Sequence, residues 1–333
     1  MTDDLVPPPP RERFDLHGQD GTRLNTEVYG PDDAPTIVLA HGWTLSIAIW
    51  ARLVRRLSRD FRVVAYDQRG HGGSDPAGPA GYTIEAVADD LATVLTATVP
   101  RDRRALLAGH SMGAMSMIAT GARHPDVLRD RVAAGVLMST GMHELLLRHR
   151  IVPLPLPLAK LAKPLSVRVM GMPAPPGRVD GLLRTMTRYV TLSRQATDAE
   201  VDFSTRIINA CPPQTRAGFA RMLGTLDLDA DVGRFDVPAI VVAGDRDRLT
   251  PIWHARRMTA ALPQSLGLVT VPGAGHMTPV EAHRAVDGAV RRLAGRYLAE
   301  TPARVVDVTG TTAPSSPAPA TTSTTGKDEE IVR

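Results

Sequence analysis

The chain has one cysteine, few aromatic residues and no long apolar run. Its single cysteine, Cys211, excludes an intrachain disulfide and a zinc site built from thiolates. Aromatic residues make up only 4% of the 333 residues, which argues against a surface on which nucleic-acid bases stack. No uninterrupted apolar run reaches the roughly 18 residues that a membrane-spanning helix needs. The net charge of +4 comes from arginines spread along the chain, so we expect no nucleic-acid partner.

The two ends differ in composition from the rest of the chain. The first residues, Met1 to Asp4, are acidic and lack the apolar stretch of a signal peptide, so we expect a cytoplasmic protein. Residues 1–11 include four consecutive prolines and predict an extended segment. Residues 301–333 are rich in Thr, Ser, Pro and Ala and nearly free of large apolar side chains, which predicts a disordered tail.

Between these ends, short apolar runs alternate with stretches of helical periodicity. Runs that are continuously apolar are typical of strands buried on both faces of a parallel sheet. Segments 84–96 and 112–123 have helical spacing, so the order predicts a doubly wound α/β fold. Segments 13–16 and 23–29 flank a Gly-Gln-Asp-Gly turn and predict an antiparallel hairpin at the sheet edge. The apolar runs lie at 36–40, 62–66, 105–108, 133–138, 239–243 and 266–271.

The alternation stops between residues 141 and 225 and resumes at Val237. Because about 85 residues is long for a loop, we predict a helical lid at 141–225. The α/β core is then split into a first part, 12–140, and a second part, 226–300.

One segment of the predicted lid, 151–172, is apolar, broken by prolines, and carries Lys160, Lys163 and Arg168. We expect it to pack its leucines onto the core. The alternative is a weak contact with a membrane surface, in which the cations lie near anionic lipid headgroups.

The strongest chemical signal is the pentapeptide Gly109-His110-Ser111-Met112-Gly113. It follows the apolar run 105–108 and precedes the helical segment 114–123. A serine in a sharp turn between strand and helix projects its hydroxyl from the sheet, and the helix directs amide groups toward developing negative charge. This context predicts that Ser111 is a nucleophile.

A serine hydroxyl needs a base, and the base needs an acid that orients it. Among ten histidines we choose His276, because its Gly-rich turn follows the last strand at the ligand-binding edge of the sheet. Two aspartates compete for the acid, in the segment that follows the run 239–243. We favour Asp247 because it lies deeper in the loop before Pro251, whereas Asp245 is better placed to cap the turn.

The oxyanion of an acyl-transfer reaction needs two backbone N–H groups aimed at one point. Met112, directly after the nucleophile, supplies one. The loop after the run 36–40 reads His41-Gly42-Trp43-Thr44, and we expect the Trp43 amide to supply the other. The Trp43 side chain should then line the substrate pocket.

These motifs, taken in order, resemble those of the α/β-hydrolase-fold enzymes, most closely the esterases, monoacylglycerol-lipase-like enzymes, perhydrolases and C–C bond hydrolases. The resemblance covers about Phe14 to Leu298. It implies an eight-stranded, mostly parallel sheet with a lid insertion, the triad Ser111, Asp247 and His276, and a structural turn at 67–74. The motifs are His41-Gly42-Trp43, Asp67-Gln68-Arg69-Gly70-His71-Gly72-Gly73-Ser74, the Ser111 pentapeptide, Gly244-x-x-Asp247 with Thr250-Pro251, and Gly275-His276.

Two departures from the family pattern narrow the expected chemistry. Epoxide hydrolases and haloalkane dehalogenases of this fold carry Asp where this chain has Ser111, so those reactions are disfavoured. Perhydrolase-like members usually carry Pro where this chain has Thr44, which weakens that interpretation.

The expected reaction is therefore cleavage of a small-molecule acyl ester, with a lean toward lipophilic acyl groups, and with no metal or organic cofactor. The alternatives are perhydrolase (haloperoxidase-like) or C–C bond hydrolase activity on the same triad. A non-catalytic ligand-binding protein is a further alternative, although it would be expected to have lost part of the triad. The oligomeric state is not predicted.

Overall fold

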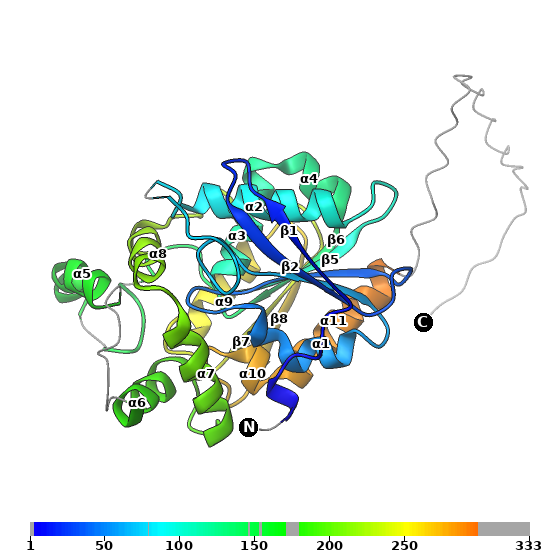
Figure 1. The fold of residues 1–333 in the computed structure, drawn as a ribbon. Helices are drawn as coiled ribbons and strands as arrows, with labels where there is room; N and C mark the ends of the chain where they lie inside the picture. Colours follow the sequence, from blue (N-terminus) through cyan, green and yellow to red (C-terminus); the bar gives the residue numbers. More distant parts are fainter. Residues whose placement is uncertain (1–2, 79, 146, 153–154, 171–179, 299–333) are drawn as a thin grey trace, which may run out of the picture. The chain divides into compact units, whose positions relative to one another are not determined.

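The computed structural model describes residues 3–78, 80–145, 147–152, 155–170 and 180–298. Within them, eight strands form one sheet in the order β1-β2-β4-β3-β5-β6-β7-β8. Figure 1 shows this sheet with the helices around it. The strands are β1 (Glu12–His17), β2 (Arg23–Tyr29), β3 (Thr36–Ala40), β4 (Arg62–Tyr66), β5 (Ala105–His110), β6 (Val132–Met138), β7 (Ala239–Gly244) and β8 (Ser265–Val271).

The strand pairing confirms the predicted fold class. β1 and β2 form an antiparallel hairpin at one edge, β2 pairs antiparallel with β4, and β3 to β8 are parallel to one another. From β3 the chain crosses to β4 on one side and then returns to β5 on the other. The carboxyl ends of β3 and β5, which pair as Ala40↔Gly109, therefore meet at a topological switch point, where ligands bind in open α/β sheets.

Helices cover both faces of the sheet (Figure 1). Strand side chains alternate between the two faces, so Val38 and Leu107 belong to one buried cluster and Leu39 and Leu106 to the other. The first cluster includes side chains of α2 (Ile84–Thr98), α3 (Met112–Arg123), α4 (Pro125–Arg131) and α9 (Ile252–Ala261). The second includes α1 (Ala51–Leu57) and α11 (His283–Tyr297), with α10 (Thr278–Glu281) and a 3-10 turn, Ile47–Trp50, beside them.

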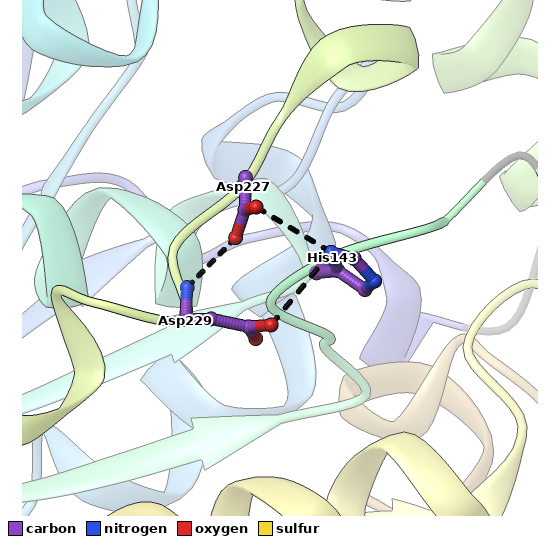
Figure 2. A group of neighbouring side chains, drawn as sticks. All are labelled: His143, Asp227 and Asp229. Carbon is purple, nitrogen blue, oxygen red and sulfur yellow. Dashed lines mark hydrogen bonds and ion pairs between the residues drawn. The ribbon is translucent and has the colours of Figure 1, made fainter.

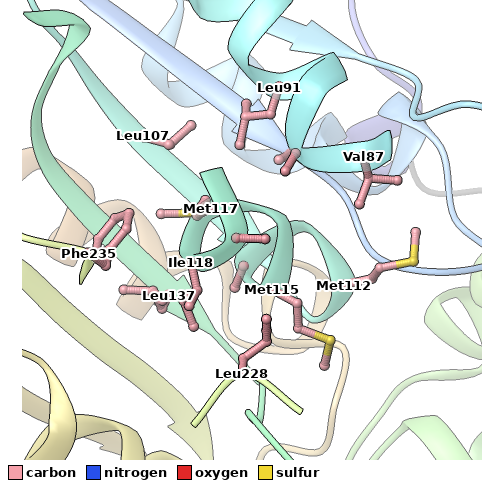
Figure 3. Packing of buried hydrophobic residues seen from close by; sticks show 14 of the residues in the cluster. Val87, Leu91, Leu107, Met112, Met115, Met117, Ile118, Leu137, Leu228 and Phe235 are labelled. Carbon is pink, nitrogen blue, oxygen red and sulfur yellow. The ribbon is translucent and has the colours of Figure 1, made fainter. Parts of the chain in front are cut away.

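Methionine fills much of the core around α3. Met112, Met115 and Met117 are fully or almost fully buried, and Figure 3 shows them with Leu91 of α2 and Leu107 of β5. Methionine is flexible and fits irregular gaps, which compensates for the shortage of aromatic side chains. This packing holds the first turn of α3, directly after Ser111, against the sheet.

Between β6 and β7, in the segment for which we predict a lid, the described residues form four helices. They are α5 (Leu156–Met170), α6 (Asp180–Thr191), α7 (Asp198–Ala210) and α8 (Pro213–Thr225), followed by a 3-10 turn, Val232–Arg234. Their action as a lid stays a prediction. None of the described helices is both long and apolar enough to span a bilayer.

Helix α5 differs from expectation in two respects. The segment is not broken by its prolines, because the helix continues through Pro164. Pro157 lies in the first turn, where proline is tolerated, and Pro164 removes one backbone hydrogen bond from the helix interior. Three of its leucines, Leu158, Leu161 and Leu165, do not pack onto the core as we expected, since they are 53%, 79% and 64% exposed.

The N-terminal segment 1–11 is not extended throughout. Asp3–Leu5 form a turn of 3-10 helix, and Leu5, only 2% exposed, joins the second buried cluster. Burial of this one apolar side chain against α1 explains the turn. The tail predicted for residues 301–333 lies outside the described residues.

Candidate active site

Ser111 occupies a sharp turn between β5 and α3. Its backbone has φ 52° and ψ −116°, a conformation that costs a residue with a Cβ about 1–3 kcal/mol. The Ser111 N–H donates a hydrogen bond to the Met138 carbonyl at 2.9 Å, and the Ser111 carbonyl accepts one from the Thr140 hydroxyl at 3.0 Å. Both partners belong to β6 and the loop after it, so the neighbouring strand holds the strained turn in place.

Two glycines let separate backbone segments meet beside Ser111. A Cβ on Gly113 would lie 2.1 Å from the Ala40 carbonyl oxygen, so α3 begins directly against the carboxyl end of β3. A Cβ on Gly42 would lie 3.1 Å from the Ser111 Cβ. The loop after β3 is therefore in contact with the Ser111 side chain.

The two amide groups expected to bind an oxyanion come from these two segments. Met112 is the first residue of α3, and helices leave their first N–H groups without partners inside the helix. In the described part of the chain, neither the Met112 nor the Trp43 amide donates to a protein acceptor. The Trp43 side chain is partly buried and packs against the first core cluster. The structure thus places both amide-bearing segments next to Ser111.

Asp247 and His276 form a buried pair. Their side chains follow β7 and β8, and Asp247 Oδ2 lies 2.8 Å from His276 Nδ1. Asp247 Oδ1 accepts from the backbone N–H groups of Leu249 (2.8 Å) and Thr250 (2.9 Å). An ionised carboxylate can only accept, so His276 Nδ1 is the donor in the bond to Asp247 Oδ2, and Nε2 takes no part in that bond.

The environment favours the ionised form of Asp247. Complete burial alone would raise the pKa of its carboxyl, but the interaction with His276 and the hydrogen bonds from Thr250 outweigh burial and lower that pKa. An ionised carboxylate beside Nδ1 stabilises a positive charge on the imidazole ring, which a catalytic base acquires when it takes a proton.

Ser111 lies next to this pair without a hydrogen bond to it. Within the described residues, the Ser111 hydroxyl does not bond His276, but the rings of His110 and His276 have their centres 5.0 Å apart. His110 Nε2 also donates to the His276 carbonyl at 2.9 Å. The residue before Ser111 therefore fixes the backbone of His276 beside the Ser111 turn. Hydrogen bonds between a nucleophile and its base often shorten only when substrate binds.

Asp245, the competing acid, has a different position. Its Oδ1 accepts from the Gly273 N–H at 2.7 Å and so ties the loop after β7 to the turn after β8. It does not contact His276 in the described structure, which matches the turn-capping role that its position in the sequence suggests.

The model of the alpha/beta hydrolase fold family matches residues 35–282 of this chain. The chain belongs to this family. The matched range contains all five residues that we singled out, which are Trp43, Ser111, Met112, Asp247 and His276. The strand order places β3 and β5, which lead into Trp43 and Ser111, side by side.

Relatives of this alpha/beta hydrolase differ in the reactions that their names record. A bifunctional esterase/perhydrolase of Acinetobacter calcoaceticus is 38% identical over 122 residues, which cover 36% of this chain and 42% of that enzyme. A non-heme chloroperoxidase of Kitasatospora aureofaciens is 27% identical over 77% of this chain and 90% of its own length. The solved structure of a thermophilic esterase from Thermogutta terrifontis is 25% identical and superposes with a TM-score of 0.66 over 86% of this chain and 98% of that one.

Two further histidines of the hydrolase are buried in the turns next to the site. His41 Nε2 accepts from the Gln68 N–H, and His71 Nε2 accepts from the Thr44 N–H, each at 3.0 Å. Burial lowers the pKa of His41 to about 4 and that of His71 to about 3, so both rings are neutral. They order the loops around the site, in agreement with the structural role implied for the turn 67–74.

Thr250 is a site residue that we did not single out from the sequence. Its hydroxyl lies 2.8 Å from Asp247 Oδ2, to which it donates, and 3.3 Å from His276 Nδ1. A threonine three residues after a loop aspartate is a recognisable capping pattern. That signal could have indicated Thr250 as the partner of Asp247.

Three potential metal ligands meet where the inserted segment leaves and rejoins the core (Figure 2). His143 Nδ1 lies 3.6 Å from Asp227 and 3.7 Å from Asp229. The guanidinium of Arg257 already pairs with Asp229, and Glu144 lies 3.3 Å from the other nitrogen of His143. Because Arg257 already pairs with Asp229 and Asp227 accepts from the Asp229 N–H, the group is a polar cluster that joins the two ends of the insertion, and we assign no metal to it.

Proposed function

We propose that the chain is a serine hydrolase that cleaves carboxylic esters, with a preference for lipophilic acyl groups. The observation that carries the proposal is the buried Asp247–His276 pair, with its 2.8 Å hydrogen bond, beside the strained Ser111 turn. An ionised acid, a base with a free Nε2 and a serine held at positive φ have a clear use together in nucleophilic catalysis.

In the first half of the proposed reaction, His276 Nε2 takes the proton of the Ser111 hydroxyl while the oxygen attacks the ester carbonyl. The carbonyl oxygen becomes an oxyanion that accepts hydrogen bonds from the amides of Trp43 and Met112. His276 then gives its proton to the alcohol, which leaves, and an acyl group stays bound to Ser111.

In the second half, water replaces the alcohol. His276 takes a proton from the water as its oxygen attacks the acyl carbonyl, and the same two amides hold the second oxyanion. Collapse of this intermediate returns the proton to Ser111 and releases the carboxylic acid. Asp247 stabilises the positive imidazole in both halves and does not itself take the proton. The steps balance as ester and water giving carboxylic acid and alcohol, with Ser111 and His276 restored at the end.

Hydrolysis of a series of esters that differ in acyl length tests this function directly. Hydrolysis of p-nitrophenyl esters with increasing acyl length should be measured for the wild type, for Ser111→Ala and for Ser58→Ala, which removes a hydroxyl at the end of α1. We expect Ser58→Ala to retain full activity and Ser111→Ala to lose at least about a thousandfold in kcat. Activity that survives Ser111→Ala contradicts the assignment of the nucleophile. A wild-type optimum at acetate contradicts the lipophilic preference.

The same acyl-enzyme gives a second candidate function, which the esterase/perhydrolase relative favours. If hydrogen peroxide attacks the acyl group in place of water, the product is a peracid and Ser111 is regenerated. Peracid formation from acetate and hydrogen peroxide, compared with ester hydrolysis by the same preparation, measures this activity. We expect hydrolysis to dominate, because the backbone at Thr44 (φ 62°) excludes the proline that perhydrolase-like enzymes usually carry there.

A further inference from the structure

Helix α5 presents an exposed apolar stripe. Leu158, Leu161 and Leu165 are 53%, 79% and 64% exposed, and their spacing of three and four residues places them on one side of the helix. The helix contains no acidic residue. Its exposed cations, Lys160 and Arg168, pair with no carboxylate in the described residues.

Helix α6 carries a second stripe of the same kind. Leu182, Met186 and Tyr189, spaced by four and three residues, are 63%, 52% and 47% exposed. The Tyr189 hydroxyl donates to the Ile151 carbonyl at 2.9 Å, which brings this stripe next to Val152, itself 57% exposed. The chain just before α5 and the end of α6 therefore belong to one surface.

The clustering of these side chains is specific to the inserted segment. Of the nine large apolar side chains that are exposed in the described residues, seven lie between residues 152 and 189. The other two, Val6 and Leu266, are isolated. Scattered exposed leucines need no explanation, but a concentration of exposed apolar side chains on two helices of one inserted segment indicates an interaction surface.

A pocket lined by arginines adjoins the α6 stripe. The Arg248 guanidinium lies 4.6 Å from the centre of the Tyr189 ring, and it donates to the Tyr189 carbonyl at 2.7 Å. Arg194 and Arg246 line the same pocket, in which Asp245 supplies the one carboxylate. The pocket therefore carries a net positive charge at the border of the apolar surface.

We propose that α5, α6 and this arginine pocket together form a docking surface for an anionic phospholipid bilayer. Two amphipathic helices with exposed leucines can insert into the boundary between headgroups and acyl chains, while nearby cations attract anionic headgroups. A second copy of the chain fits less well, because a two-fold contact would place this positive surface against itself. The proposal does not depend on the reaction at Ser111.

Co-sedimentation with vesicles tests the proposal on the full-length chain. One vesicle preparation contains phosphatidylcholine alone, and the other contains phosphatidylcholine mixed with phosphatidylglycerol. We expect the protein to sediment with the anionic vesicles, to bind the neutral ones more weakly, and to dissociate as salt screens the headgroups. Ser111→Ala should bind as the wild type does, so that loss of activity and loss of docking are told apart.

Matched variants assign the binding to the surface. Leu161→Glu with Leu165→Glu, and separately Lys160→Glu with Arg194→Glu, should each weaken binding to anionic vesicles at least about tenfold. Leu266→Glu, a substitution at the isolated exposed leucine on β8, should leave binding unchanged, and unfolding midpoints should show that all variants are folded. The proposal is overturned if the wild type stays in the supernatant with both vesicles, or if the double leucine variant binds normally. It is also overturned if that variant instead converts a dimer into a monomer in light scattering.

Discussion

His71 accepts a hydrogen bond from the Thr44 backbone N–H at 3.0 Å, and through it a buried, neutral ring positions the loop that carries the Trp43 amide. Thr44 has φ 62°, a conformation that needs such support in a residue other than glycine. On its other side, His71 stacks on Phe219 of α8, with ring centres 5.4 Å apart. One imidazole thus links an inserted helix to the loop proposed to bind the oxyanion.

Removal of the acceptor on His71 should impair catalysis more than substrate binding. We expect His71→Leu to lower kcat for ester hydrolysis by about tenfold to a hundredfold with little change in KM, because an oxyanion donor acts mainly in the transition state. His71→Gln, whose amide oxygen can accept from Thr44, should recover part of the loss. His17→Leu on β1 is the matched control. An equal rise in KM for His71→Leu and His71→Gln would contradict this positioning role.

The hydroxyl of Thr250 should help to orient Asp247 toward His276 and so increase the rate of catalysis. Thr250→Val keeps the shape of the side chain but removes the hydrogen bond to Asp247 Oδ2, so we expect kcat to fall about tenfold. Thr250→Ser should restore the activity. Thr259→Val on α9 serves as the control, because its hydroxyl bonds only within its own helix. Kinetics unchanged in Thr250→Val would show that the backbone amides alone orient Asp247.

The contact between Gly113 and β3 should make any side chain at position 113 destabilising. Gly113→Ala places a Cβ against the Ala40 carbonyl, and neither backbone can move without disturbing the sheet, so we expect a loss of about 2 kcal/mol or more in the free energy of unfolding. Gly288→Ala on α11 meets nothing within 4 Å and should be neutral or stabilising by about 0.5–1 kcal/mol. Urea denaturation of Gly113→Ala and Gly288→Ala measures the two free energies of unfolding. Similar stabilities of the two would contradict the close approach.

Buried histidines should make the protein less stable in mild acid. Burial lowers the pKa of His41 and His254 to about 4, and of His71 and His110 to about 3, from 6.5. Below pH 6.5 the unfolded chain binds protons that the folded chain does not, so the free energy of unfolding falls as the pH drops toward these values. Each histidine contributes up to about 1.4 kcal/mol per pH unit.

Denaturation midpoints from about pH 7.5 to about pH 5.5 measure this dependence. The stability should change little near pH 7.5 and decrease increasingly below about pH 6.5, and at the acid end of the range His71→Gln should lower the proton uptake on unfolding by about one. Stability that is constant across the range would show that these rings are protonated in the folded protein.

Much of the fold was predictable because its strands are buried on both faces. Their continuous apolar runs, such as Thr36–Ala40 and Arg62–Tyr66, coincide with β3 and β4, and the helix predicted after Ser111 coincides with α3. Asp247, which we favoured for its position in the loop, lies next to His276, whereas Asp245 bonds Gly273; the catalytic role of Asp247 stays a prediction. In each case a local pattern determines the local structure.

Other features depend on contacts between distant segments, and a local pattern does not reveal those. The spacing of Leu161 and Leu165 predicts an apolar stripe but does not say what the stripe faces, and here it faces outward. The bond from His110 to the His276 carbonyl joins residues that are 166 positions apart. The turn Asp3–Leu5 buries Leu5 in a cluster that also contains side chains of α1, a contact that the local sequence does not predict.

The most direct measurement for the proposed reaction is covalent labelling with a fluorophosphonate, followed by mass spectrometry of the digested protein. Such a probe reacts with a serine only when a base activates it and an oxyanion site stabilises the product. We predict a label on Ser111 in the folded wild type, none in His276→Ala, and slower labelling in Asp247→Asn. Folded wild-type protein that stays unlabelled, or that carries the label on another serine, would contradict the proposal that Ser111 is the nucleophile.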